Sequence, residues 1–330
     1  MKIKKKEISG NYLRKMNRKA IIISLSGTTL SKKESILISK EKPWGVILFK
    51  RNINNFNQVK NLIKNIRKII KDKKYPILID EEGGTVSRLS NFINNRDFSQ
   101  NFFGSIYNKD KQTALKIYKN YIILICQIFK KIGININTVP VLDVPYKNTH
   151  KILQTRTYSN NRNIIKNLGA FCIKIYRSQK VSTVVKHIPG HGCAAADSHK
   201  SLPVVNKKLS ELNKNDFHCF KGISSHFAMT AHILYKKIDS KNPATHSSKI
   251  INQIIRNKIG FKGILISDDI SMKALKYGLI KNATKSLESG CNLVLYCAGK
   301  NQDLSKLLKN IPHIDKFTAK KTSEFYNFLS

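Results

Sequence analysis

The chain has 330 residues, 41% of them apolar, and its 60 basic residues against 20 acidic ones give a formal net charge of +40. Its length and apolar content exclude a disordered chain, because they suffice for a substantial core. So large a charge normally indicates a nucleic acid or an anionic membrane as partner. Lysine, asparagine and isoleucine recur throughout the sequence, however, without a focused basic stripe that carries stacking aromatics. We therefore interpret the charge as compositional bias, and we expect no specific nucleic acid and no membrane as partner.

The N-terminal region begins with a basic arm, residues 1–19, followed by an apolar run at 20–26. This order is also found in signal peptides, but the run is short and no small-residue cleavage pattern follows it, so we interpret it as a strand. No stretch reaches the ~18 apolar residues that a membrane helix needs. The six cysteines are scattered without a Cys-x-x-Cys pair, as is typical of reduced cysteines in a cytoplasmic protein. We expect a cytoplasmic location.

Short apolar runs with the length and composition of buried strands recur along the chain. Amphipathic stretches at 58–70, 112–131 and 162–177, with apolar residues every three to four positions, predict helices between several of them. This alternation predicts a single (β/α)8 barrel, the TIM-type fold, and the absence of a linker favours one domain over residues 20–330. The expected strands are 21–26, 45–49, 76–80, 135–140, 182–187, 227–232, 263–268 and 292–297.

Charged and titratable residues lie at the predicted strand ends. In barrel enzymes the active site is built from the C-terminal ends of the strands and the loops after them. We therefore expect these residues to meet at one rim, as a group of acids, imidazoles and a lysine. They are Asp80 with Glu81 and Glu82, Asp143, Lys186 with His187, His232, and Asp268 with Asp269.

The segment KHIPGHGCAAADSH, residues 186–199, is the densest group of reactive side chains. His187, His191 and His199 with Asp197 contain ligand types that suit zinc or iron, but no compact ligand spacing of known geometry is present. The two common phosphate-binding glycine patterns are also absent. We expect neither a metal nor a cofactor.

Asp197 and His199 are the more suggestive pair within this segment. Two residues apart in an extended segment face the same side, so the carboxylate can hold the second ring nitrogen and the imidazole can give and accept a proton. Such a pair is often purely structural. Asp268 supplies a carboxylate at the end of a buried strand, and one of Asp268 and Asp269 is expected to cap a helix that starts near Ser271. Strand parity does not decide which of the two faces the substrate.

The ordered motifs of the chain resemble family 3 glycoside hydrolases of the bacterial cytoplasmic β-N-acetylhexosaminidase type. Any single motif is weak evidence, whereas the ordered set covers most of the chain and is specific. The motifs are WGVILFKRN at 44–52, IDEEGG at 79–84, NTVPVLDV at 137–144, KHIPGHG at 186–192, DSH at 197–199, MTAH at 229–232, NPAT at 242–245 and SDDISM at 267–272.

The resemblance implies a retaining mechanism in which Asp268 is the nucleophile and His199, assisted by Asp197, is the general acid/base. It further implies a set of residues that hold the non-reducing sugar. The chain departs from the family pattern at Thr85, where arginine is usual, and at Ile188, where an aromatic is usual; both concern packing more than chemistry. The implied sugar-binding residues are Asp80, Arg88, Arg156, Lys186 and His187.

The implied substrate is terminal β-linked N-acetylglucosamine on peptidoglycan fragments that are recycled in the cytoplasm. One alternative is a β-glucosidase of the same family, although those usually carry a second domain and a Ser-Asp-Trp motif. A second is a phosphorylase, since a histidine acid/base places no second carboxylate beside an incoming phosphate. A third is an inert barrel that binds anionic polymers, which the intact Asp197, His199 and Asp268 disfavour.

Overall fold

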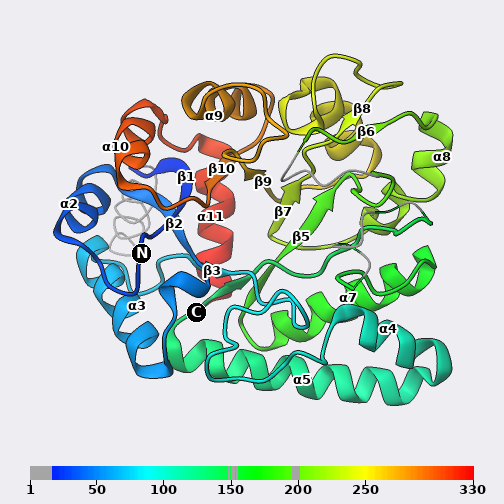
Figure 1. The fold of residues 1–330 in the computed structure, drawn as a ribbon, viewed down its shortest axis with the longest axis horizontal. Helices are drawn as coiled ribbons and strands as arrows, with labels where there is room; N and C mark the ends of the chain where they lie inside the picture. Colours follow the sequence, from blue (N-terminus) through cyan, green and yellow to red (C-terminus); the bar gives the residue numbers. More distant parts are fainter. Residues whose placement is uncertain (1–16, 148, 150–152, 154, 195–200) are drawn as a thin grey trace, which may run out of the picture.

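The computed structural model describes residues 17–147, 149, 153, 155–194 and 201–330. Within these residues, eight parallel strands close into a barrel in the order β1-β10-β9-β7-β5-β4-β3-β2 (Figure 1). This confirms the predicted (β/α)8 barrel. A further two-stranded sheet pairs β6 (Val204–Val205) with β8 (Leu234–Tyr235). The barrel strands are β1 (Lys19–Ser24), β2 (Pro43–Leu48), β3 (Ile77–Ile79), β4 (Ile136–Asn137), β5 (Ser182–Ile188), β7 (Phe227–Thr230), β9 (Ile264–Asp269) and β10 (Leu293–Tyr296).

Helices surround the strands, and the three predicted amphipathic stretches are confirmed as α3, α5 and α7. In α3 the apolar residues Val59, Leu62, Ile63 and Ile66 return every three to four positions, and all four are buried. The helices are α2 (Lys32–Glu41), α3 (Phe56–Ile70), α4 (Gln100–Lys109), α5 (Lys111–Ile132), α7 (Arg162–Ser178), α8 (Leu209–Lys214), α9 (Leu279–Glu288), α10 (Asn301–Asn310) and α11 (Lys316–Phe328), with short helices η1 (Lys50–Asn52), η2 (Phe217–Phe220) and η3 (Ala244–His246) and the π-helix η4 (Ile250–Lys258).

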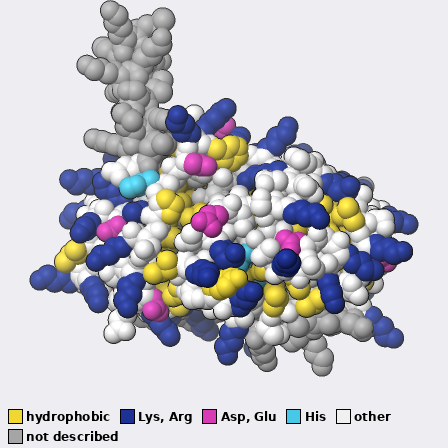
Figure 2. Space-filling model, turned by 90° about the horizontal axis from the view of Figure 1, so that it is seen from above, with side chains coloured by type: hydrophobic (Ala, Val, Ile, Leu, Met, Phe, Trp, Pro, Cys, Tyr) yellow, Lys and Arg dark blue, Asp and Glu magenta, His cyan; other side chains and the backbone are white. Residues whose placement is uncertain are grey.

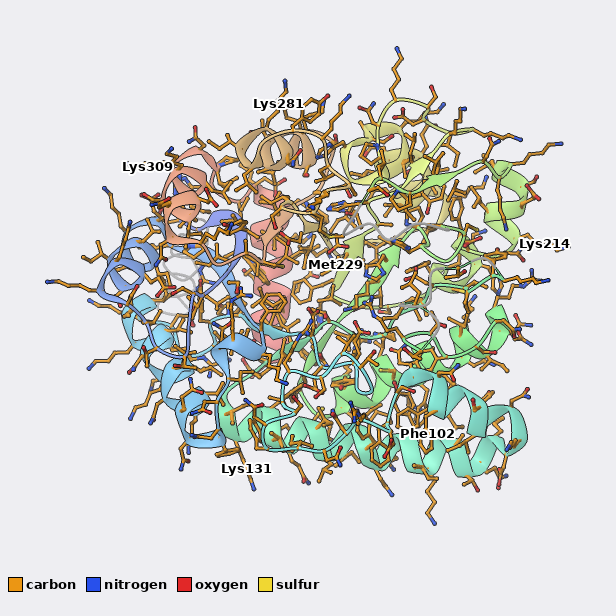
Figure 3. All side chains as sticks on the ribbon, in the orientation of Figure 1. Phe102, Lys131, Lys214, Met229, Lys281 and Lys309 are labelled. Carbon is orange, nitrogen blue, oxygen red and sulfur yellow. The ribbon has the colours of Figure 1, made fainter. Side chains whose placement is uncertain are left out.

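The barrel strands are buried on both faces, as is usual for parallel sheets covered by helices. Every residue of β2 and of β5 is buried. Met229 of β7, labelled in Figure 3, is 4% exposed and lies among the side chains in the middle of the molecule. These continuous apolar runs are the reason that the strands could be predicted from the sequence.

Helix α11 closes the N-terminal end of the barrel and lies across the middle of the molecule in Figure 1, whereas most other helices lie around its edge. The indole Nε1 of Trp44, in β2, donates to Thr322 Oγ1 at 2.9 Å. The rings of Phe227, in β7, and Phe325 have centroids 5.2 Å apart. Since this end is filled by apolar contacts, the opposite end is the one available for a site.

The N-terminal boundary of the barrel can be placed by Arg18 and β1. Arg18 is 6% exposed, pairs with Asp72, and donates to the hydroxyl of Tyr326 at 2.7 Å. Strand β1 begins at Lys19, so the last two residues of the predicted arm pack with the barrel. The division into an arm at 1–19 and a domain at 20–330 otherwise stays a prediction. In the described part of the chain, no helix is both long enough and apolar enough to cross a membrane.

Candidate active site

The predicted site residues within the described part of the chain lie together at the C-terminal ends of the strands. Asp80 follows β3, Lys186 and His187 lie in β5, and Asp268 lies in β9. Arg88 and Arg156 join the same group from loops, as the contacts below show. The predicted acid/base pair, Asp197 and His199, lies outside the described residues and stays a prediction.

Asp80 is the centre of a charge network. Its Oδ1 lies 3.3 Å from Lys186 Nζ and accepts a hydrogen bond from the hydroxyl of Thr138, and its Oδ2 lies 3.3 Å from Arg88 Nη2. Burial alone would raise the pKa of Asp80, but the Lys186 and Arg88 cations lower it well below its usual range. Asp80 is therefore ionised at all ordinary pH values. Its side chain remains 15% exposed, so it can accept further hydrogen bonds.

Glu82 was expected at the rim, but sequence reasoning gave it no role among the site residues. Its carboxylate accepts from Arg156 Nε at 2.8 Å and Nη2 at 2.9 Å, and from Lys186 Nζ at 2.6 Å. Burial would raise the pKa of Glu82, but Arg156 and then Lys186 lower it to about 2. The available signal was its position two residues after Asp80 in IDEEGG, which places both carboxylates at the same strand end.

The ammonium group of Lys186 has a protein acceptor for each of its three N–H donors. Its Nζ lies 2.6 Å from Glu82, 2.9 Å from the Thr138 hydroxyl and 3.3 Å from Asp80. An ammonium group has three N–H donors, so these acceptors match its capacity. A sugar hydroxyl that bonded Lys186 would have to displace one of them. Lys186 is thus placed to act on a sugar mainly through Asp80.

His187 is oriented by Asp143, the buried aspartate after β4. His187 Nδ1 lies 2.7 Å from Asp143 Oδ2, and the backbone N–H groups of His187 and His191 donate to Oδ1 at 3.2 and 2.6 Å. Burial would raise the pKa of Asp143, and His187 lowers it below the usual range. An ionised carboxylate only accepts, so Nδ1 carries a proton and the Nε2 edge of the ring points away from Asp143.

Asp268 and Asp269 have different partners. The carboxylate of Asp269 accepts from the backbone N–H of Ser271 at 3.0 Å, from its hydroxyl at 2.6 Å, and from the N–H of Cys297 at 3.1 Å. The expected helix start near Ser271 is wrong, because α9 begins at Leu279. Asp269 instead ties the turn after β9 to the residue that follows β10. This structural role leaves Asp268 as the candidate for chemistry.

Two buried histidines lie close enough to Asp268 to interact with it electrostatically. Burial lowers the pKa of His191 to about 4, and it also lowers the pKa of His232. The charge of Asp268 acts in the opposite direction on both rings without overcoming the burial. At neutral pH both imidazoles are uncharged, and the carboxylate is not neutralised by an adjacent imidazolium from either one.

The histidine-rich segment at 186–199 contains side chains of the types that bind metals, and the structure describes its residues 186–194. Among the described residues, no group of three or more His, Cys, Asp or Glu side chains is arranged to hold a metal ion. Asp143 meets His187 through the ring Nδ1 and meets His191 through the backbone N–H. These contacts are hydrogen bonds rather than a ligand sphere.

Comparison with known proteins agrees with this geometry. The family described as "Glycosyl hydrolase family 3 N terminal domain" matches residues 16–320. The beta-hexosaminidase of Neisseria meningitidis serogroup A is 32% identical over 287 residues, which are 85% of this chain and 78% of the relative. That of Nitrosomonas eutropha is 30% identical over 284 residues, 84% of this chain and 80% of the relative. The crystal structure of NagZ from Neisseria gonorrhoeae in complex with N-trifluoroacetyl-D-glucosamine superposes with a TM-score of 0.85 at 27% identity, covering 94% of this chain and 90% of that one.

The fold and the acidic rim together define a glycoside hydrolase. The chain belongs to glycosyl hydrolase family 3, because the family match spans nearly its whole length. This confirms the resemblance that the ordered motifs indicated.

Proposed function

We propose that the protein is a retaining exo-β-N-acetylglucosaminidase that removes terminal, non-reducing β-linked N-acetylglucosamine from peptidoglycan fragments in the cytoplasm. The observation that carries this proposal is the network centred on Asp80. An ionised, partly exposed carboxylate held by Lys186 and Arg88 is suited to accept hydrogen bonds from neighbouring sugar hydroxyls. The names of the relatives and the amino-sugar analogue bound to the Neisseria gonorrhoeae protein support the choice of sugar.

In the proposed reaction the nucleophile is Asp268. One carboxylate oxygen attacks the anomeric carbon, while His199 gives its proton to the departing glycosidic oxygen and Asp197 supports the imidazolium. The bond to the aglycone breaks and a glycosyl-aspartate forms. His199 then takes a proton from water, the water oxygen attacks the anomeric carbon, and Asp268 leaves as a carboxylate. Most retaining glycosidases use a second carboxylic acid in place of His199.

The sugar is held by residues that the structure already connects. Asp80 is the principal acceptor, with Arg88 beside it, and the Nε2 edge of His187 is available for a further hydroxyl or the acetamido group. Arg156 and Lys186 share Glu82, which keeps both cations in place before substrate arrives. A site arranged in advance spends less binding free energy on ordering side chains.

The primary test uses purified protein with aryl β-N-acetylglucosaminide and aryl β-glucoside. We expect turnover of the former and little of the latter; preference for the glucoside would make the protein a glucosidase. Sugar phosphate among the products in phosphate buffer would make it a phosphorylase. Binding of anionic polymer without turnover, with a steep salt dependence, would leave an inert barrel. On the face shown in Figure 2, lysine and arginine side chains are spread out rather than gathered in one patch, which does not favour that last outcome.

The nucleophile is tested by covalent trapping with a slow fluorosugar substrate. We expect one label on the peptide that contains Asp268, and loss of the label in Asp268→Ala. Labelling at Asp269 would contradict the assignment.

The acid/base role is tested with His199→Ala. We expect an activated aryl glycoside to retain a measurable first step, since its leaving group needs little protonation, while natural fragments are no longer cleaved. Equal losses on both substrates would contradict the acid role.

A further inference from the structure

Two sequence motifs without an assigned role, MTAH at 229–232 and NPAT at 242–245, meet at the C-terminal end of β7. The hydroxyls of Thr230 and Thr245 lie 2.8 Å apart, and Thr245 Oγ1 lies 2.7 Å from His232 Nδ1. The other ring nitrogen, Nε2, lies 3.0 Å from the carbonyl oxygen of Asp269. Thr230, His232 and Thr245 are each 0% exposed. A buried chain of hydrogen bonds therefore runs from these motifs to the strand end that carries Asp268.

The direction of each hydrogen bond in this series follows from which of its groups can donate and which can only accept. A carbonyl oxygen only accepts, so His232 Nε2 carries a proton and donates to Asp269. Burial lowers the pKa of His232, so the ring is neutral and its Nδ1 is an acceptor. Thr245 therefore donates its single proton to Nδ1, and the bond between the two threonines is donated by Thr230. The Ala231 carbonyl, 3.2 Å from the Thr245 hydroxyl, is the more distant acceptor for that proton.

Asp269 connects this series of hydrogen bonds to the carboxylate of Asp268. The backbone N–H of Asp269 donates to Asp268 Oδ1 at 2.8 Å. The carboxylate of Asp269 is itself fixed by Ser271 and by the N–H of Cys297. Any movement of the Asp269 backbone would therefore move the hydrogen-bond donor that orients Asp268. The carbonyl oxygen of Asp269 accepts from His232 Nε2 at 3.0 Å and also from the backbone N–H of Met272 at 3.1 Å, so His232 is the side chain that holds this group.

We propose that His232 is a positioning residue, which Thr245 keeps in the Nε2–H tautomer and which fixes the backbone of Asp269 so that the carboxylate of Asp268 points at the anomeric carbon. The proposal rests on the proposed function in that Asp268 is taken as the nucleophile. His232 is not itself a proton carrier for the substrate, because both of its ring nitrogens are engaged by Thr245 and Asp269.

The kinetic test compares His232→Leu with His232→Gln. Leucine removes the donor to Asp269, whereas the glutamine amide has an N–H donor close to the position of the imidazole Nε2. We expect the single-turnover rate of glycosylation by an aryl β-N-acetylglucosaminide to fall about 100-fold in His232→Leu, the size of effect that a small misplacement of a reacting group produces. We expect a loss of less than about 10-fold in His232→Gln and an intermediate loss in Thr245→Val.

A readout of sugar affinity separates positioning from general damage. The affinity for N-acetylglucosamine as a competitive inhibitor should be unchanged in all three variants, because the sugar is held by groups on other strands. The matched control is His226→Leu, at the opposite end of the same strand, where Nδ1 lies 2.9 Å from the Ser182 hydroxyl. It loses a part-buried hydrogen bond of the same ring type and should keep the glycosylation rate. A normal rate in His232→Leu, or parallel losses of rate and affinity in His232→Gln, would overturn the proposal.

Nitrogen NMR of ¹⁵N-histidine-labelled wild-type protein tests the tautomer without using activity. We expect His232 to show a protonated Nε2 and an unprotonated Nδ1, and Thr245→Val to weaken this preference. A proton on Nδ1, or on both nitrogens at neutral pH, would overturn the hydrogen-bond directions on which the proposal stands. If wild-type protein cleaves no β-N-acetylglucosaminide, the proposed function fails, while the NMR result still decides the state of His232.

Discussion

Glu82 and Arg156 are joined by two parallel hydrogen bonds, Nε to Oε2 at 2.8 Å and Nη2 to Oε1 at 2.9 Å, in a buried position. Lys186 shares the same carboxylate at 2.6 Å. Two of the cations that the family resemblance implies for sugar binding are therefore held by one residue that does not belong to the implied set. Such two-pronged pairs fix orientation as well as charge.

Glu82→Gln should destabilise the protein and weaken substrate binding. Removing one partner of a buried ion pair typically costs about 3 to 5 kcal/mol, because the remaining charge is left uncompensated. Arg156 and Lys186 would then be free to shift, so KM for an aryl β-N-acetylglucosaminide should rise more than kcat falls. Denaturant unfolding and steady-state kinetics measure the two effects. The matched control is Glu324→Gln, which breaks the exposed pair with Lys321 and should change stability by less than about 1 kcal/mol.

The pH dependence of stability should contain a contribution from Glu82. The folded-state pKa of about 2 lies below the ordinary pKa of 4.5 for a free glutamate. A carboxyl group with a lowered folded pKa stabilises the fold above its unfolded pKa and loses that contribution as the pH falls through the folded value. The difference in unfolding free energy between wild type and Glu82→Gln should therefore be largest above pH 4.5 and shrink towards pH 2. A constant difference across this range would contradict the assigned pKa.

The fold was predictable because most barrel strands contain a short apolar, buried run, but the residues at which strands end were harder to predict. The run 135–140 was expected as one strand, whereas β4 covers only Ile136–Asn137. Pro140 has no backbone N–H to offer a ladder, and the chain rejoins β5 only through the isolated bridge between Val141 and Lys186. The apolar composition of the run therefore overestimated the length of the strand, because pairing with β5 is interrupted near Pro140.

A residue of the candidate site could be predicted where its own position at a strand end identifies it. It could not be predicted where its role depends on contacts with residues distant in sequence. Asp80, Lys186 and Asp268 end strands and were found in that way. Glu82 was given no role because its significance depends on Arg156 and Lys186, which are distant in sequence. The expected helix near Ser271, capped by Asp268 or Asp269, failed for a similar reason, since the carboxylate of Asp269 also binds the N–H of Cys297, the residue that follows β10.

Asp143→Asn should impair the site without unfolding it. The asparagine side chain can accept from the backbone N–H groups of His187 and His191, but it lacks the negative charge that fixes the proton on His187 Nδ1. If His187 contacts the sugar, kcat/KM for an aryl β-N-acetylglucosaminide should fall by about 10-fold or more, mainly through KM. The exposed Asp97→Asn is a suitable control for the change of charge. An effect confined to kcat would indicate that His187 acts in the chemical step instead.

Two truncations should place the functional start of the domain. Arg18 donates to the Tyr326 hydroxyl and pairs with Asp72, and the Tyr326 hydroxyl also donates to Asp72 at 2.6 Å. These contacts join the start of β1 to α11, the helix that closes the barrel.

A chain that starts at residue 17 keeps all of these contacts and should match full-length protein in stability and turnover. A chain that starts at Lys19 loses Arg18 and leaves Asp72 without its cation, so we expect a loss of about 3 kcal/mol in unfolding free energy. Arg18→Met in the full-length protein should reproduce that loss with residues 1–17 still present. Equal stability of the two truncated chains would show that Arg18 belongs to the arm, in agreement with the predicted arm at residues 1–19.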